Sequence, residues 1–459
     1  MKATTLSVLA LALSASAAFA QNAATGTETG GTPSKDTTVA APPVTPSLFV
    51  PISIQHARPN DIRGLNVFET PKAPGAAWTG FKLDVGAAFT QQFQGLSHSN
   101  AAQAVTKTGT DGKPYNANQL IVMGHGFNNA VANLYVNAQL AKGIRVALTQ
   151  YLSARHHQET WVKDGYFLID ASPFDNALLT KMMEYTTIKI GHYEINYGDQ
   201  HFRRTDNGNA FFNPFVGNLI MDAFSTEIGA EVMLRAKGFQ AMGAVHNGES
   251  RGTILNAPKR APAFIGKLGY DNQFTPDLRL RLTGSIFSQA RATSQTLYSG
   301  DRGGSRYYDV LENVVSTEKD QAWSGAVNPA MNQQHAYVIN PFIQFKGLEY
   351  FGNYEKATGK NLTETVDRSV KQNSSELVYR FLENKLWVGG RYNTVNGRLA
   401  AQTQDFDVTR TQYSAGWYVL PTLNIKGEIV KQEYKGFAPT DIRNGGKFNG
   451  FMLEATVAF

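Results

Sequence analysis

The sequence contains no cysteine, which excludes disulfides, thiolate nucleophiles and metals held by sulfur. Long apolar runs are also missing. Beyond the first twenty residues no stretch approaches the roughly 18 consecutive apolar residues that a membrane-spanning helix needs. Acidic residues are fewer than basic ones, 37 against 43, and the formal net charge is +6. This balance fits contact with anionic solutes or anionic lipid headgroups. No nucleic-acid-binding motif accompanies the basic charge, so no nucleic-acid partner is expected.

Several motifs of catalysis and metal binding are absent as well. There is no glycine-rich phosphate loop ending in Lys-Ser or Lys-Thr and no His-Glu-x-x-His sequence. The polar segment 192–209 lacks the spacing of a calcium loop and has no histidine pair one helical turn apart. We therefore predict a non-enzymatic protein without metal or cofactor. A serine, a histidine and an acid that converge from distant segments would escape this test, so a barrel enzyme of lipase or protease type stays an alternative.

The N-terminal region divides into two predicted segments. Lys2, the apolar run Leu6–Leu13 and the small-x-small sequence Ala18-Phe19-Ala20 predict a secretory signal peptide over residues 1–20. Residues 21–76 begin with a stretch rich in Thr, Gly, Ala and Pro that lacks periodicity. Such composition predicts a disordered or loosely docked periplasmic leader. Residues 77–459 are the predicted membrane domain.

From residue 79 onwards, apolar and polar residues alternate in separate segments. The last is the clearest, since Phe451, Leu453, Ala455, Val457 and Phe459 occupy every second position. Period two over about ten residues predicts a strand that crosses a bilayer as part of a closed barrel. We find about sixteen such segments: 79–90, 131–140, 144–153, 160–170, 186–195, 226–235, 238–247, 262–271, 277–289, 334–346, 348–355, 374–381, 385–393, 410–419, 423–433 and 448–459.

The connections between these segments are alternately long and short. This asymmetry is typical of outer-membrane barrels, which have short periplasmic turns and long extracellular loops. We predict an all-β fold, a single transmembrane antiparallel β-barrel of about 16 strands. One connection on the short side, 171–185, contains a sequence that predicts a helix of one to two turns.

Alternation also assigns side chains to the lumen. Residues between lipid-facing positions point inward, which predicts a charged, water-filled channel rather than a packed core. Twelve inward residues are basic and six are acidic. The acidic ones are Asp84, Glu227, Glu231, Glu376, Glu428 and Glu454, and Lys82, Lys189, Arg235 and Arg380 are among the basic ones. The predicted channel-lining residues are Arg145, Lys267, Arg279, Arg281, Lys385, Arg391, Arg410 and Lys426. Their charges either attract anions or pair across neighbouring strands.

The densest polar segment, 192–209, leaves a strand and enters a long connection. If this loop folds inward and narrows the pore, Arg203 and Arg204 are candidate constriction residues. The alternative is a well-ordered, solvated surface loop whose Asn and Gly residues form turns.

Two of these segments resemble a known family. Gly416–Lys426 is similar to the penultimate hairpin of the phosphate-selective porin O and P family, and Ile188–Glu194 to the glycine-centred strand before its pore loop. The resemblance implies a sixteen-stranded, usually trimeric barrel that passes anions. We therefore predict a porin with a mild anion preference, a passive diffusion channel for small hydrophilic solutes. Its expected location is the outer membrane of a Gram-negative-type bacterium.

The expected partners follow from this prediction. They are outer-membrane lipid, small anionic solutes, further copies in a homotrimer, and the barrel assembly machinery, which Phe459 would engage as a terminal aromatic residue. A plugged structural or adhesive barrel is a further alternative to the channel.

Overall fold

The computed structural model describes residues 57–70, 78–153, 160–248, 260–294, 297–298, 308–315 and 325–459. The chain divides into a unit Met1–Pro51 and a unit Ile52–Phe459, and all described residues belong to the second. The predicted signal peptide and the predicted leader up to residue 56 lie outside the described residues, so both stay predictions.

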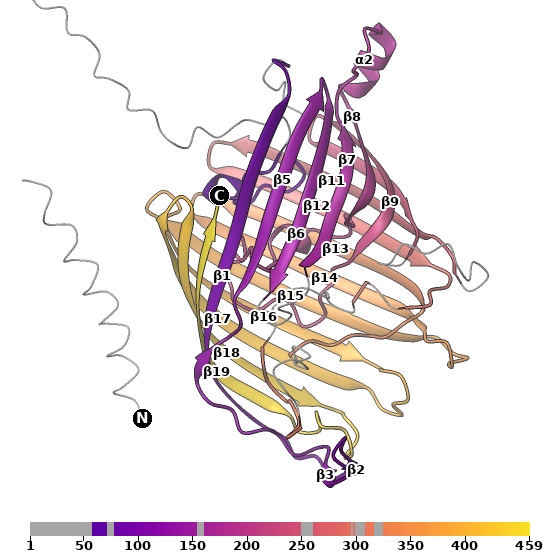
Figure 1. Cartoon of the computed structure of the whole chain (residues 1–459), viewed down its shortest axis with the longest axis vertical. Coiled ribbons are helices and arrows are strands. Elements are labelled where there is room, and N and C mark those ends of the chain that lie inside the picture. The colour runs from indigo at the N-terminus through magenta and orange to yellow at the C-terminus, as the bar shows by residue number, and fades with distance from the viewer. Residues whose placement is uncertain are drawn as a thin grey trace, which may run out of the picture. The chain divides into compact units, whose positions relative to one another are not determined.

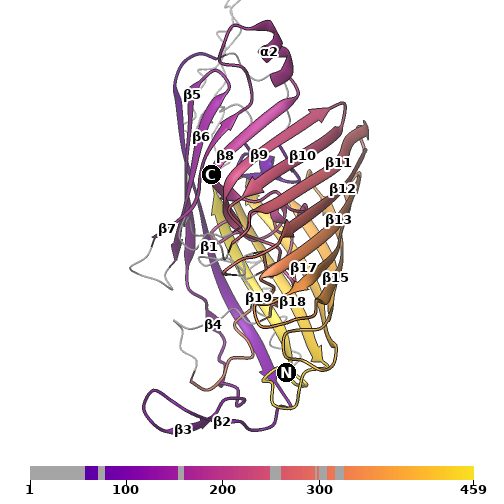
Figure 2. The ribbon, with the colours of Figure 1, turned by 90° about the vertical axis from the view of Figure 1, so that its right-hand side faces the viewer.

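The second unit is a closed antiparallel barrel (Figures 1 and 2), as the sequence predicted. The long strands of the described residues are β1 (Lys82–Ser99), β5 (Val131–Ala141), β6 (Ile144–Ser153), β7 (Thr160–Ile169), β8 (Thr186–Glu194), β9 (Thr226–Ala236), β10 (Phe239–His246), β11 (Ala263–Thr275), β12 (Leu278–Gln289), β13 (Gln333–Phe345), β14 (Leu348–Lys360), β15 (Arg368–Phe381), β16 (Leu386–Gly397), β17 (Phe406–Leu420), β18 (Leu423–Lys435) and β19 (Lys447–Ala458).

The barrel closes between its first and last long strands. β1 pairs with β19, with Phe89 opposite Val457, and also with β5. A two-residue strand, β4 (Gly126–Phe127), adds to the edge of β1. The strands β2 (Thr106–Thr108) and β3 (Pro114–Asn116) form a separate hairpin in the first long connection.

Short helical segments interrupt the connections. The predicted helix is present as α2 (Ala177–Met183), and the Asn176 side chain caps it by accepting from the N–H of Leu179. The 3-10 turns η1 (Ile62–Gly64) and η3 (Gln200–Phe202) lie in the leader and in the connection between β8 and β9. Within the described residues, no helix is both long and apolar enough to span a membrane.

The two faces of the wall follow the predicted alternation. On β12, Leu282 and Ile286 are 55% and 61% exposed on the outer face, whereas Arg281, Thr283 and Ser285 are buried inside. An outer face of this kind suits contact with lipid chains.

The inside of the barrel differs from the prediction, because much of it is packed rather than open. Residues 57–70, the β8–β9 connection 195–225 and parts of the β12–β13 connection contribute buried side chains. Val216, Ile220 and Met221 of the β8–β9 connection share one apolar cluster with the inward-facing Val395 and Val408 of the wall. The expectation of a wholly water-filled lumen was wrong. Alternation shows which residues face inward, but not whether loops enter and cover them.

Candidate functional site

Two adjoining cavities inside the barrel are lined by residues that the structure describes. The middle cavity has a volume of about 220 Å3 and the turn-side cavity of about 180 Å3. They lie between the β8–β9 connection and the wall formed by β5–β9. The two cavities share six lining residues, Arg58, Tyr166, Lys189, Glu194, His201 and Phe202. Arg145 and Arg235, which are next to short turns, line only the turn-side cavity. A single polar space therefore runs from the turn end toward the middle of the barrel.

A buried lysine organises the middle cavity. Lys163 Nζ lies 2.8 Å from Glu194 Oε2, 2.6 Å from Asp206 Oδ2 and 3.6 Å from Asp164 Oδ2. The strand register shifts beside it, between Thr149 and Gln150 of β6. Because of this irregularity Lys163 and Asp164 are both buried, although they are neighbours in the strand. Sequence alternation missed Lys163 because it assumes an unbroken period of two.

The β8–β9 connection folds into the barrel and is not a solvated surface loop. Arg203 is 2% exposed, and its Nη2 lies 3.5 Å from Glu349 and 3.7 Å from Glu376. Arg204 forms an ion pair with Asp222, and its guanidinium lies over the Phe224 ring. Of the two candidate constriction residues, Arg204 lines the middle cavity and Arg203 lines neither cavity.

His201 in the same connection sits between the two cavities. Its Nδ1 lies 3.2 Å from Glu194 Oε1, and its Nε2 lies 3.1 Å from Asn196 Oδ1. Burial lowers the pKa of His201, and the nearby Glu194 only partly opposes this effect.

Part of the predicted leader also lies in the lumen. Glu69 places one carboxylate oxygen 2.7 Å from Lys267 Nζ and the other 2.7 Å from Arg281 Nη2. Phe68 packs edge-on against Phe342 and Phe202, at ring-centroid distances of 5.2 and 5.8 Å. We call residues 57–70 the inner segment. It narrows the space beside the cavities and contributes Arg58 to the lining of both.

The charges of Lys267 and Arg281 hold the inner segment electrostatically. Burial alone would raise the pKa of Glu69, but Arg281 and Lys267 outweigh it and keep that pKa well below its usual range. Asp199 of the β8–β9 connection meets the same two cations, at 2.8 Å from each.

Most of the predicted lining residues are inside the barrel but paired. Arg279 lies 2.7 Å from Asp271, Arg391 2.7 Å from Glu376, and Lys426 2.7 Å from Glu454. Arg410 donates to Gln432 and to the carbonyls of Asn218 and Gly325. Of the eight predicted lining residues, only Arg145 lines one of the two cavities.

One predicted lining residue is elsewhere. Lys385 is exposed in the turn before β16, because the strand begins at Leu386, one residue later than predicted. It does not line the lumen wall.

Two features bear on the enzyme alternative. Ser288 Oγ lies 3.0 Å from His335 Nδ1, but both are on the outer face, and among the described residues no carboxylate contacts His335. A Gly-x-Ser-x-Gly sequence occupies residues 248–252 after β10, and only Gly248 is described. The strand before it belongs to an antiparallel barrel, whereas a nucleophile elbow needs a strand–turn–helix context. Among the described residues, Ser288 and His335 therefore form no catalytic triad.

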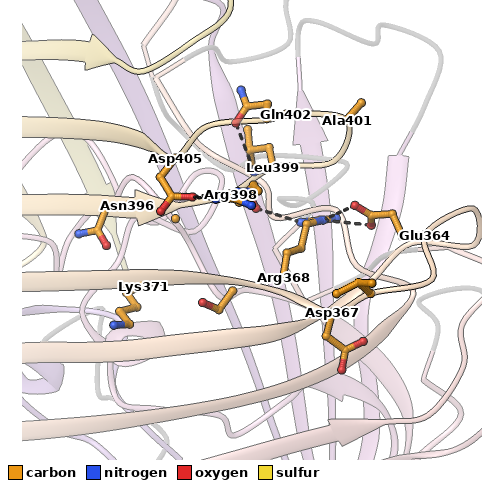
Figure 3. A pocket seen from close by; sticks show the side chains of 13 residues that line it. Glu364, Asp367, Arg368, Lys371, Asn396, Arg398, Leu399, Ala401, Gln402 and Asp405 are labelled. Carbon is orange, nitrogen blue, oxygen red and sulfur yellow. Dashed lines mark hydrogen bonds and ion pairs between the residues drawn. The ribbon is translucent and has the colours of Figure 1, made fainter.

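A third cavity, of about 420 Å3, lies at the long-loop rim between the β14–β15 and β16–β17 connections (Figure 3). Its arginines are neutralised, since Arg398 lies 2.9 Å from Asp405 and Arg368 2.9 Å from Glu364. In the described part of the chain, no group of three or more His, Asp or Glu side chains is placed to hold a metal.

No protein-family model and no curated protein sequence matches the chain. Among solved structures it is similar to OmpT, an outer membrane protein of Vibrio cholerae, with 10% identity, a TM-score of 0.47 and coverage of 84% of this chain and 100% of that chain. It is also similar to the anion-selective porin from Comamonas acidovorans, with 10% identity, a TM-score of 0.48 and coverage of 83% and 100%. Salmonella typhi OmpF in complex with daunomycin gives 12% identity, a TM-score of 0.48 and coverage of 83% and 98%. Identities and TM-scores this low support no conclusion about family or function.

Proposed function

We propose that this protein is a porin-like channel of the outer membrane of a Gram-negative-type bacterium, which passes small hydrophilic solutes and catalyses no reaction. The observation that supports this most is the pair of adjoining cavities inside a closed barrel, lined by charged side chains. An exposed apolar outer wall supports the membrane location. The inner segment and the β8–β9 connection make the path narrow.

The charge of this path supports a mild anion preference. Its cationic residues are Arg58, Arg145, Lys163, Lys189, Arg204 and Arg235, and its acidic residues are Glu69, Asp164, Glu194, Asp206 and Glu231. The lining has one more cationic than acidic residue, but Arg204 is paired with Asp222 outside the lining. The anion preference therefore rests on Lys189, for which the described residues provide no ion pair. In a narrow path with low-dielectric walls, a small excess of one charge is enough to favour counter-ions.

Single-channel recording in planar bilayers tests this function. We expect discrete current steps, smaller than those of a barrel with an open lumen, and a reversal potential on the anion side in a salt gradient. The absence of any current would favour a second candidate, a plugged structural barrel, which the apolar cluster inside the lumen supports. A reversal potential on the cation side would remove the anion preference.

The resemblance to the porin O and P family adds two proposals of its own. The barrel would assemble as a homotrimer, which chemical cross-linking in native membranes tests. Phosphate would compete with chloride for the path, and addition of phosphate would then reduce the chloride current.

A further inference from the structure

Lysines gather on the outer face of the barrel near the long loops. Lys356 of β14 lies directly opposite Lys371 of β15 in the strand register. Two like charges opposite each other on one sheet face are destabilising unless a counter-charge joins them. Within the described residues, neither side chain has an ion pair or a hydrogen bond, and Lys371 is exposed.

The long-loop ends of β18 and β19 carry further lysines, and the register places Asn396 and Asp407 between them and Lys371. Lys431 of β18 and Lys447 of β19 are both exposed at the long-loop ends of their strands. Glu433 compensates part of this charge, because it lies 2.8 Å from Lys431 and 3.9 Å from Lys435. We call Lys356, Lys371, Lys431 and Lys447 together the lysine face.

The lysine face borders the apolar band of the wall. Ile429 precedes Lys431 by one step on the same face and is 64% exposed, and Tyr354 stands in the same relation to Lys356. At the opposite ends of these strands the outward residues, such as Leu377, Tyr379 and Ile425, are uncharged. The ammonium groups therefore lie where lipid chains end and headgroups begin.

A recess adjoins the lysine face at this level. Lys371 lines the rim cavity of about 420 Å3, together with Asn396 and Ser369 (Figure 3). Since Arg368 and Arg398 are neutralised by their own carboxylates, the ammonium of Lys371 remains without a counter-charge. The lining also includes Asp367, which lies 3.8 Å from Lys360 Nζ, so Lys371 is the lining cation for which the described residues provide no ion pair.

We propose that the lysine face docks the phosphorylated headgroup of a glycolipid in the outer leaflet of the membrane. One phosphate group bridges Lys356 and Lys371, and a sugar hydroxyl reaches the recess beside Asn396. The phosphate removes the repulsion between the two lysines, because its negative charge forms ionic contacts with both ammonium groups. This proposal rests on the proposed membrane location, but not on conduction.

The test uses the full-length protein in detergent, with bis-phosphorylated lipid A as the probe and native mass spectrometry as the readout. The double variant Lys356→Gln/Lys371→Gln should bind lipid A about thirtyfold more weakly, because a lysine near anionic headgroups contributes about fivefold in affinity. The matched control Lys142→Gln/Lys181→Gln removes two exposed charges from the short-turn side and should bind as the wild type does. Lipid A without its phosphates should bind the wild type about as weakly as bis-phosphorylated lipid A binds the double variant.

Three outcomes would overturn the proposal. They are equal binding by the Lys356/Lys371 variant, equal binding of phosphate-free lipid A, and a changed oligomeric state of the variant with unchanged lipid binding, which would mark a protein contact. Heat-modifiable migration on gels confirms that each variant is folded. The double variant Lys431→Gln/Lys447→Gln provides a second, independent test of the lysine face. Because binding is read without current, a barrel that conducts nothing can still pass this test.

Discussion

Glu69 holds the inner segment in the lumen through two cations, Lys267 and Arg281. Removing one partner of a buried ion pair costs about 3–5 kcal/mol when the remaining charge is left uncompensated. The cost here is smaller, because Lys267 and Arg281 keep Asp199, but the inner segment loses its tie to both. Glu69→Gln should therefore loosen the inner segment and increase single-channel conductance. Asp61→Asn is the matched control, since Asp61 bonds Arg63 within its own turn and not the barrel wall. Equal conductance changes in both variants would contradict the role of Glu69.

The stabilisation that Glu69 gives to the inner segment should depend on pH in a defined direction. The pKa of Glu69 is held well below its usual range, so the carboxylate stays charged from neutral pH down through the ordinary carboxylate range. Its stabilisation is complete above the unfolded-state pKa and is lost only as pH falls through the lowered pKa. Recordings should show constant conductance between pH 7 and about 5 and an increase only in stronger acid. An increase already near pH 6 would assign the effect to another group.

Among the lining residues, Lys189 should have the most direct electrostatic effect on ions in the path. It lines both cavities, and its Nζ lies 4.6 and 4.3 Å from the ring centroids of Tyr166 and Tyr193. Among the described residues no carboxylate lies within ion-pair distance of it. Lys189→Gln should shift the reversal potential toward cations, most at low salt, where screening is weakest. Lys181→Gln on α2 removes the same charge outside the lumen, and an equal shift there would refute the assignment.

Sequence alternation placed Arg279 and Arg281 inside the barrel but could not show their partners. Arg279 meets Asp271, and Arg281 meets Asp199 and Glu69. These acids come from a neighbouring strand, an inward loop and the inner segment. Side-chain pairing depends on how such segments enter the lumen, which period-two alternation does not encode. An excess of basic residues in the sequence therefore overstated the free positive charge of the pore.

At the scale of elements, β8 depends on a glycine. Gly191 has a φ of +144°, and a Cβ there would lie 2.4 Å from the carbonyl oxygen of Gly165 on β7. Gly191→Ala should lower the stability of the barrel by at least about 1–3 kcal/mol, the cost of a backbone conformation reserved for glycine. The measurement is the temperature at which the heat-modifiable gel band disappears.

Gly243 of β10 is the matched control for this substitution. A Cβ at Gly243 would meet no atom within 4 Å, and its φ is not positive. Gly243→Ala should therefore stay within about 0.5 kcal/mol of the wild type. If both variants lose the same stability, the effect belongs to glycine in any strand and not to the geometry at Gly191.

All sixteen predicted strands are present, and most of the larger errors in their bounds lie at the long-loop ends; β11, which runs to Thr275 instead of residue 271, is an exception at a short turn. β14 continues to Lys360 and β15 begins at Arg368, beyond the predicted bounds of 355 and 374. The hydrogen-bond ladder extends past the apolar band, where outward residues such as Lys356 and Thr358 no longer alternate in polarity with inward ones. The alternation of apolar and polar residues arises because outward residues contact lipid. The alternation therefore stops where the lipid chains end.

At the scale of the whole molecule, Phe459 extends the hydrogen-bond ladder that closes the barrel. Phe459 exchanges two backbone hydrogen bonds with Ala87, of 2.9 and 3.0 Å, and its ring is 53% exposed on the outer face. Deletion of Phe459 removes both the ladder pair and the ring. We expect unfolded protein in the periplasm, measured as loss of the heat-modifiable band from cells.

Two variants separate the effects of that deletion. Phe459→Ala keeps the ladder pair and removes only the ring, and Phe345→Ala removes a comparable outward ring at a short turn. If the assembly machinery reads the terminal ring, Phe459→Ala should reduce folded barrel far more than Phe345→Ala. Normal amounts of folded barrel after deletion of Phe459 would contradict both effects.

The pairing of β1 with β19 also sets the order of folding. All other pairings between long strands join neighbours in the sequence, whereas this seam joins the two ends of the membrane domain. The entropy of closing so long a loop must be overcome before the seam gains any contact, which makes closure late and slow. Until then, the sheet has two open edges whose unpaired backbone groups can recruit other chains. The yield of folded protein therefore depends on how long this open sheet survives, and less on the final stability of the barrel.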